Sequence, residues 1–150
     1  MSILRLKLPT DPRWVNIAEK NITEILTDHA FCEQKAASAA ISIIVQFPEY
    51  PDLVDAMTDL AREEMEHFQR VHDQLKKRGL QLGYERKDPY VGDLRTFFKD
   101  KSGGRKQYLI NTLLLAAMIE ARSCERFRVL SENIADEELS SFYAELMKSE

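Results

Sequence analysis

Helical periodicity is the feature that most constrains how this sequence can fold. Between Leu53 and Leu75, apolar side chains recur at steps of three or four residues, which places them on one face of an amphipathic helix. Two polar residues, Glu64 and His67, interrupt that face. A carboxylate buried alone costs on the order of several kcal/mol, so a neighbouring group must neutralise it. Because the face carries no Lys or Arg, and because Glu and His three residues apart point the same way, a divalent metal ion is the simplest partner.

Three further stretches show the same periodicity. We predict long helices from Ile22 to Phe47, from about Pro51 to Arg78, after the break at 101–104 with an apolar face from Leu109 to Ile134, and from Asp136 onward. Prolines 48 and 51, Gly79 and the Gly103-Gly104 pair supply the breaks. Shorter helices are expected around Trp14 and Ile17, and around Leu94, Phe97 and Phe98 inside a long 80–104 crossover whose residues 80–92 read as a loop.

Composition agrees with one all-α domain spanning residues 1–150. Only 5 Gly and 5 Pro are present, too few for a turn-dense β-sandwich. The net charge of -4 does not by itself indicate nucleic-acid binding. We expect Cys32 and Cys124 to be buried free thiols in a reducing compartment. Neither a signal peptide nor an apolar run of about 18 residues is found, so we expect a cytoplasmic protein that does not span a membrane.

Each predicted long helix carries one glutamate on its apolar face: Glu33, Glu64, Glu120 and Glu150. The first pair is separated by 31 residues and the second by 30, so each interval runs along one helix and back along the next. This pattern predicts a four-helix bundle with a carboxylate-bridged pair of metal ions, in which two helices give a Glu and two give Glu-x-x-His. The second His would follow Glu150 by three residues, and we expect the fourth helix to be truncated before it.

Oxygen-rich ligands with one or two imidazoles suit iron or manganese, and a reduced di-iron pair activates dioxygen for oxidation chemistry. A buried Glu–His pair with a purely structural role is the alternative for Glu64 and His67. Glu63 and Glu66 lie off the apolar face and are expected in solvent. Glu125 lies about 140° around the helix from Glu120, and we expect it to face solvent or Arg122. His29, one turn before Glu33, is either a neighbour of the metal or a core histidine.

Several runs carry a resemblance to a known family, and they are Asp28-His29-Ala30-Phe31-Cys32-Glu33-Gln34-Lys35-Ala36-Ala37, Glu63-Glu64-Met65-Glu66-His67-Phe68, Arg78-Gly79, Asp88-Pro89-Tyr90 and Ile119-Glu120-Ala121-Arg122-Ser123-Cys124-Glu125-Arg126-Phe127. The chain, from about residue 10 to its end, resembles the tRNA 2-methylthio-N6-isopentenyladenosine hydroxylases. The resemblance implies a ferritin-like fold and a non-haem di-iron monooxygenase. Such an enzyme uses O2 and an external electron donor to hydroxylate the isopentenyl group of an adenosine beside the tRNA anticodon. Carried over, the ligands of the two iron ions are Glu33, Glu64, His67, Glu120 and Glu150.

The sequence itself supports a tRNA partner only through basic clusters. One cluster surrounds the end of the second long helix, and the other precedes the third; they are Lys76, Lys77, Arg78, Arg86 and Lys87, and Lys99, Lys101, Arg105 and Lys106. Such residues bind phosphates, while Tyr84 and Tyr90 are candidates for stacking on bases. Solvated helix ends explain the same residues. Two other functions stay open: another ferritin-like di-iron oxidase, such as a ferroxidase or peroxidase, and a non-enzymatic helical interaction module.

Overall fold

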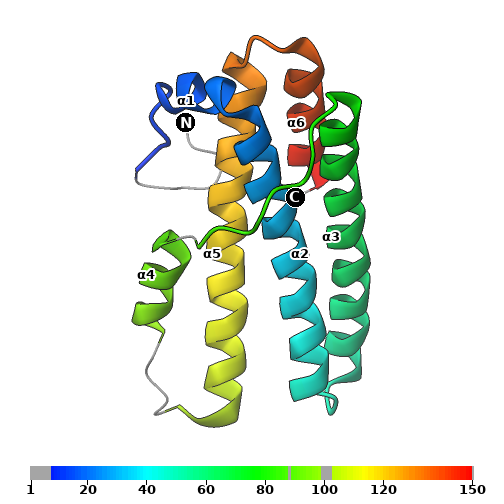
Figure 1. Ribbon diagram of the computed structural model, residues 1–150. Helices are drawn as coiled ribbons and strands as arrows, with labels where there is room; N and C mark the ends of the chain where they lie inside the picture. The colour runs from blue at the N-terminus through cyan, green and yellow to red at the C-terminus, as the bar shows by residue number, and fades with distance from the viewer. Residues whose placement is uncertain (1–7, 88, 99–102, 150) are drawn as a thin grey trace. The chain divides into compact units, whose positions relative to one another are not determined.

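The computed structural model describes residues 8–87, 89–98 and 103–149, and every regular element among them is an α-helix (Figure 1). In chain order the helices are α1 (Trp14–Lys20), α2 (Ile22–Gln46), α3 (Pro51–Lys77), α4 (Pro89–Phe97), α5 (Gly104–Asn133) and α6 (Glu137–Ser149). The chain divides into two compact units, residues 21–87 and residues 1–20 with 88–150. No helix in the described part of the chain is long and apolar enough to cross a membrane.

The unit of residues 21–87 is an antiparallel hairpin of α2 and α3, which lie side by side in Figure 1. Pro51 begins α3, where its fixed φ suits a first helical turn and its missing N–H costs nothing. Small residues on α2, Ala30, Ala37 and Ala40, are buried, as are Val71 and Leu75 on α3. The predicted apolar faces therefore form the hairpin core.

Helix α3 ends where Gly79 predicts, with a pair of reverse hydrogen bonds. The Gly79 N–H donates to the Lys76 carbonyl at 3.0 Å, and the Leu80 N–H donates to the Leu75 carbonyl at 3.0 Å. Gly79 has φ +68°, a left-handed conformation that an L side chain disfavours. This Schellman motif turns the chain back toward α2.

The segment that follows α3 is fastened along α2. The Gly83 N–H donates to Thr27 Oγ1 at 3.2 Å, and Lys35 pairs with Glu85 at 2.8 Å. Arg86 donates to Asp28 at 2.8 Å and to Glu24 at 3.1 Å. Arg86, which the sequence offered as a phosphate ligand, thus connects the loop to α2 within this unit.

The other unit is built on an antiparallel pair, α5 and α6, and α1 and α4 both contact α5. Asp136 caps α6 by accepting a hydrogen bond from the Leu139 N–H at 2.9 Å. Phe127 and Tyr143 stack with ring centroids 5.5 Å apart, and Leu130, Leu139 and Leu146 of the same two helices are fully buried. Tyr143 is therefore a core residue of this unit.

Two details of the prediction are wrong. Cys32 is exposed rather than buried, because α2 turns this position away from its partners, while Cys124 is half-buried. The crossover loop is shorter than predicted, since α4 begins at Pro89, within the segment 80–92 that reads as loop. Proline favours the first turn of a helix, which explains the earlier start. Glu150, Lys99 and Lys101 lie outside the described residues.

Candidate metal centre

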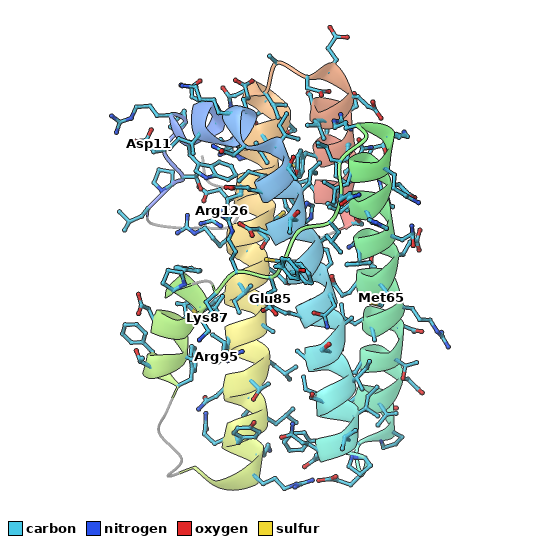
Figure 2. The ribbon with its side chains drawn as sticks, in the orientation of Figure 1. Asp11, Met65, Glu85, Lys87, Arg95 and Arg126 are labelled. Atoms are coloured by element: carbon cyan, nitrogen blue, oxygen red, sulfur yellow. The ribbon has the colours of Figure 1, made fainter. Side chains whose placement is uncertain are left out.

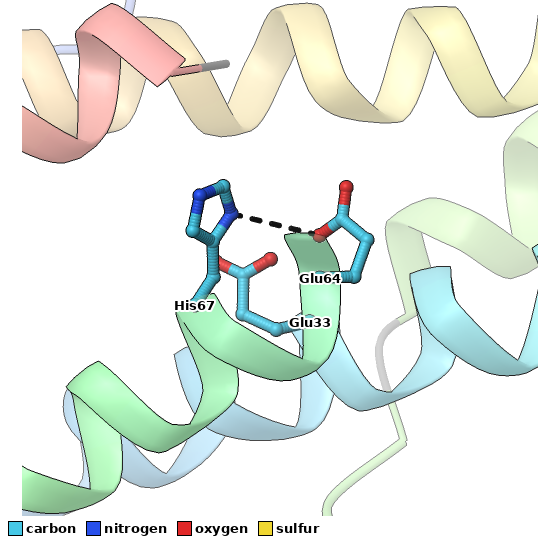
Figure 3. A group of neighbouring side chains, drawn as sticks. All are labelled: Glu33, Glu64 and His67. Carbon is cyan, nitrogen blue, oxygen red and sulfur yellow. Dashed lines mark ion pairs between the residues drawn. The ribbon is translucent and has the colours of Figure 1, made fainter. Parts of the chain in front are cut away.

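Helices α2 and α3 bring three of the predicted ligands together. Ligand atoms of Glu33, Glu64 and His67 all lie within 4.8 Å of one another, and Figure 3 shows the three side chains converging. Each residue is only 3% exposed. Glu64 and His67 sit three residues apart on α3, so they project from the same face, and Glu33 comes from the middle of α2.

Each of these carboxylates lies beside an imidazole. His67 Nδ1 lies 3.9 Å from Glu64 Oε2, and His29 Nε2 lies 2.5 Å from Glu33 Oε1. His29 is itself buried, one helical turn before Glu33. This contact fits both hypotheses for His29, a neighbour of the metal that orients Glu33 and a core histidine with a satisfied hydrogen bond, so the role of His29 stays a prediction.

The donor set fits a divalent transition metal. Two buried carboxylates supply hard oxygen donors, and one imidazole supplies a borderline nitrogen donor, a combination that suits iron or manganese. Two carboxylates at this separation repel each other unless a cation or a proton lies between them. Because both are taken out of water, that repulsion is weakly screened.

The other predicted ligands belong to the second unit. Glu120 lies on α5 and is half-buried, while Glu150 lies outside the described residues. The structure thus brings Glu33, Glu64 and His67 together and leaves the roles of Glu120 and Glu150 as predictions. Glu63 and Glu66 are exposed, as their positions off the apolar face predict.

Of the two alternatives expected for Glu125, the contact with Arg122 is confirmed and exposure to solvent is wrong, because Glu125 is buried. It accepts hydrogen bonds from the Thr10 N–H at 3.0 Å and the Thr10 hydroxyl at 2.9 Å, and it pairs with Arg122 at 2.5 Å. Burial acts to raise the pKa of Glu125, but the bonds from Thr10 and the charge of Arg122 outweigh it and lower the pKa below its ordinary value. The spacing of Arg122 and Glu125 is visible in the sequence, whereas Thr10 lies 115 residues away.

The chain matches known proteins over nearly its whole length. A family model described as "tRNA-(MS[2]IO[6]A)-hydroxylase (MiaE)" matches residues 2–150. A tRNA 2-(methylsulfanyl)-N(6)-isopentenyladenosine(37) hydroxylase of Pseudomonas putida is 40% identical over 145 residues, which are 97% of this chain and 69% of the relative. The hydroxylase of the same name from Salmonella typhimurium is 27% identical over 199 residues, covering 97% of this chain and 70% of the relative.

A solved structure gives the same fold. It is described as "Protein 43 with aldehyde deformylating oxygenase activity from Synechococcus", and it superimposes with a TM-score of 0.88 at 38% sequence identity. The match covers 96% of this chain and 70% of that chain. This likeness confirms the predicted all-α, ferritin-like fold class, and the family match argues against a non-enzymatic interaction module. The chain therefore belongs to the MiaE family of tRNA hydroxylases.

Proposed function

We propose that this protein is a non-haem di-iron monooxygenase that hydroxylates the isopentenyl side chain of 2-methylthio-N6-isopentenyladenosine in the anticodon loop of tRNA. The observation that carries the proposal is the buried trio of Glu33, Glu64 and His67 in a chain of this family. The names of both hydroxylase relatives support the substrate, since each specifies an isopentenyladenosine at position 37 of tRNA. We also propose that the enzyme acts in the cytoplasm.

The trio would hold half of the metal centre. Glu33, Glu64 and His67 are its proposed ligands from one unit, and Glu120 and Glu150 are those from the other. When bound, two iron ions would supply the capacity to oxidise an unactivated carbon–hydrogen bond with O2 and electrons from an external donor. The protein's own contribution is to keep the carboxylates dry and oriented, and His29 fixes Glu33 through the 2.5 Å contact.

Two single substitutions on α3, each compared with the wild-type protein, test the proposal. The reduced protein, loaded with iron and given isotopically labelled O2, should add one labelled oxygen atom to the prenyl group of substrate tRNA, detected by mass spectrometry of the nucleosides. Glu64→Ala should abolish this product, because it removes a buried ligand, whereas Glu63→Ala should retain it, because Glu63 is exposed. The proposal would be refuted if the iron-loaded wild-type protein left the tRNA unchanged.

The Synechococcus structure supports a second candidate, an oxygenase that acts on an aldehyde. Its sequence identity to this chain, 38%, is close to the 40% of the Pseudomonas putida hydroxylase. Incubation of the same loaded protein with a long-chain aldehyde separates the two. Conversion of the aldehyde, with no hydroxylated nucleoside from tRNA, would favour the second candidate.

A further inference from the structure

A recess in the unit of α1, α4 and α5 has no role in the proposed metal centre. Its volume is about 340 Å³, and it is lined by Thr10, Asp11, Trp14, Tyr90, Arg122 and Arg126. Figure 2 labels Asp11 and Arg126, which come from the segment before α1 and from α5. Two arginines, a tryptophan and a tyrosine around one hollow form a combination that binds nucleotides.

Arg126 lies against the tryptophan of this recess. Its guanidinium carbon is 5.6 Å from the centroid of the Trp14 ring, within the range of a cation–π contact. Among the described residues no carboxylate pairs with Arg126, and its side chain is exposed. A cation held in place by an aromatic ring, with its charge not neutralised, is well suited to receive a phosphate.

Arg122 is fixed more firmly. Its Nη1 donates to the Leu8 carbonyl at 2.9 Å and to Glu125 Oε2 at 2.5 Å. Both of these bonds to described residues use Nη1, so the Nε and Nη2 edge of the guanidinium is left for a ligand. Glu125 in turn is held by Thr10, which orients Arg122 toward the recess.

The negative charge of Asp11, the acidic residue that lines the recess, is balanced by a neighbouring arginine. Asp11 pairs with Arg13 at 2.5 Å, and hydrogen bonds from Arg13 lower the pKa of Asp11 to about 2. With Asp11 matched by Arg13 and Glu125 matched by Arg122, the charge of Arg126 remains in excess. The recess is therefore locally cationic, although the whole chain has a net charge of -4.

We propose that this recess binds one nucleotide of the RNA substrate, with its phosphate on Arg122 and Arg126 and its base against Trp14 and Tyr90. The proposal rests on the proposed function, because it takes tRNA as the partner. It also gives a role to Arg122 and Arg126, which belong to one of the runs that carry the family resemblance and are not among the proposed metal ligands. The basic residues suggested by the sequence fit less well, since Arg86 and Lys76 are paired with acidic neighbours.

Trp14 makes the test direct, because it is the only tryptophan of the chain. The full-length protein is titrated with an unmodified anticodon stem-loop RNA, and binding is followed by Trp14 fluorescence and, with labelled RNA, by anisotropy. Base stacking near Trp14 should quench its fluorescence along the same binding curve as the anisotropy. Anisotropy that saturates while Trp14 fluorescence stays constant would overturn the proposal.

Three arginine variants identify the contact. Arg126→Gln should weaken RNA binding about tenfold and lower the slope of log K against log salt by about 1, as expected for one lost phosphate contact. Arg126→Lys should keep the slope but reduce the quenching, because it retains the charge without the planar guanidinium. Arg128→Gln is the matched control on the same helix, since Arg128 pairs with Glu132 and does not line the recess. Equal losses in Arg126→Gln and Arg128→Gln would contradict a specific site.

A second ligand separates RNA from an acidic protein partner. Polyglutamate of the same total charge offers carboxylates but no bases, so it should quench Trp14 weakly, and quenching as strong as that by RNA would overturn the nucleotide assignment. Because the RNA is unmodified, binding does not depend on the oxidation reaction. If Arg126→Gln still hydroxylated tRNA with an unchanged KM, the assignment of this site would be contradicted while the proposed function would stand. Quenching of Trp14 by RNA, with no hydroxylation of tRNA by the iron-loaded protein, would support this site and contradict the proposed function.

Discussion

His29 contacts Glu33 on the buried side of α2, and its effect on metal affinity can be measured. If Glu33 is a ligand, His29→Ala removes the group that orients it, and we expect the affinity for Fe(II) or Mn(II) to fall about 10- to 100-fold at unchanged stoichiometry. Equilibrium metal titration gives both quantities. His29→Gln, which retains a hydrogen-bond donor, should recover part of the loss.

His72→Ala is the control for this variant. His72 lies on α3, half-buried, with its ring centroid 6.1 Å from that of Phe68, and it is not part of the trio. Its removal should leave metal affinity unchanged. A similar loss in both variants would mean that His29 acts only through packing.

Glu125 predicts a pH dependence of stability. Its folded-state pKa lies below the ordinary value of 4.5, so its ionised form stabilises the fold above pH 4.5, and this contribution is lost as the pH falls through the lowered pKa. We expect Glu125→Gln to reduce the free energy of unfolding by on the order of 1 kcal/mol at pH 7 and by less at pH 3.5. Urea denaturation at both pH values measures the difference.

The comparison variant for Glu125 is Glu132→Gln. Glu132 pairs with Arg128 at the surface, where an ion pair contributes little, so its loss should change stability slightly at either pH. If Glu125→Gln reduced the free energy of unfolding as much at pH 3.5 as at pH 7, the claim that the ionised form of Glu125 stabilises the fold would be contradicted.

At the scale of single helices, two glycines predict opposite effects. Gly79 has φ +68° at the end of α3, so Gly79→Ala should lower the free energy of unfolding by about 1 kcal/mol, because alanine resists the left-handed conformation. Gly92 lies inside α4, and a Cβ added there would meet no atom within 4 Å, so Gly92→Ala should raise the free energy of unfolding by about 0.5–1 kcal/mol. Thermal denaturation of both variants tests the pair, and a shift of the same sign in both would refute the backbone argument.

The helices were predictable because their limits are local. Pro51 and Gly79 mark the ends of α3, and apolar residues at steps of three and four mark its inner face. What the local pattern does not contain is the partner of each polar side chain. Arg86 reads as a free cation until Asp28 and Glu24 are seen to accept its hydrogen bonds, and Cys32 reads as buried because its helix is amphipathic.

At the scale of the whole molecule, the difference between local patterns and distant partners explains why the metal-binding trio could be predicted and the recess could not. Glu33, Glu64 and His67 could be found together because one hairpin joins them, and a turn of known length sets their register. The recess could not be found, since Trp14 and Arg126 are distant in sequence and no periodicity connects them. Nor does Glu125 stand out from the other glutamates of α5 until Thr10 is placed beside it.

Metal binding should be visible as a change in the stability of the entire chain. A metal ion that binds the folded state alone, present at about 100 times its Kd, stabilises that state by about 2.7 kcal/mol, which corresponds to a rise in Tm of about 5–10 °C for a domain of this size. We expect Mn(II) to produce this shift in the wild-type protein and EDTA to reverse it. Glu64→Ala should lose the shift, because a buried ligand is gone, while Glu66→Ala should keep it, because Glu66 is exposed on the same helix. Differential scanning calorimetry with and without Mn(II) measures all three proteins, and a shift that survives in Glu64→Ala would place the metal elsewhere.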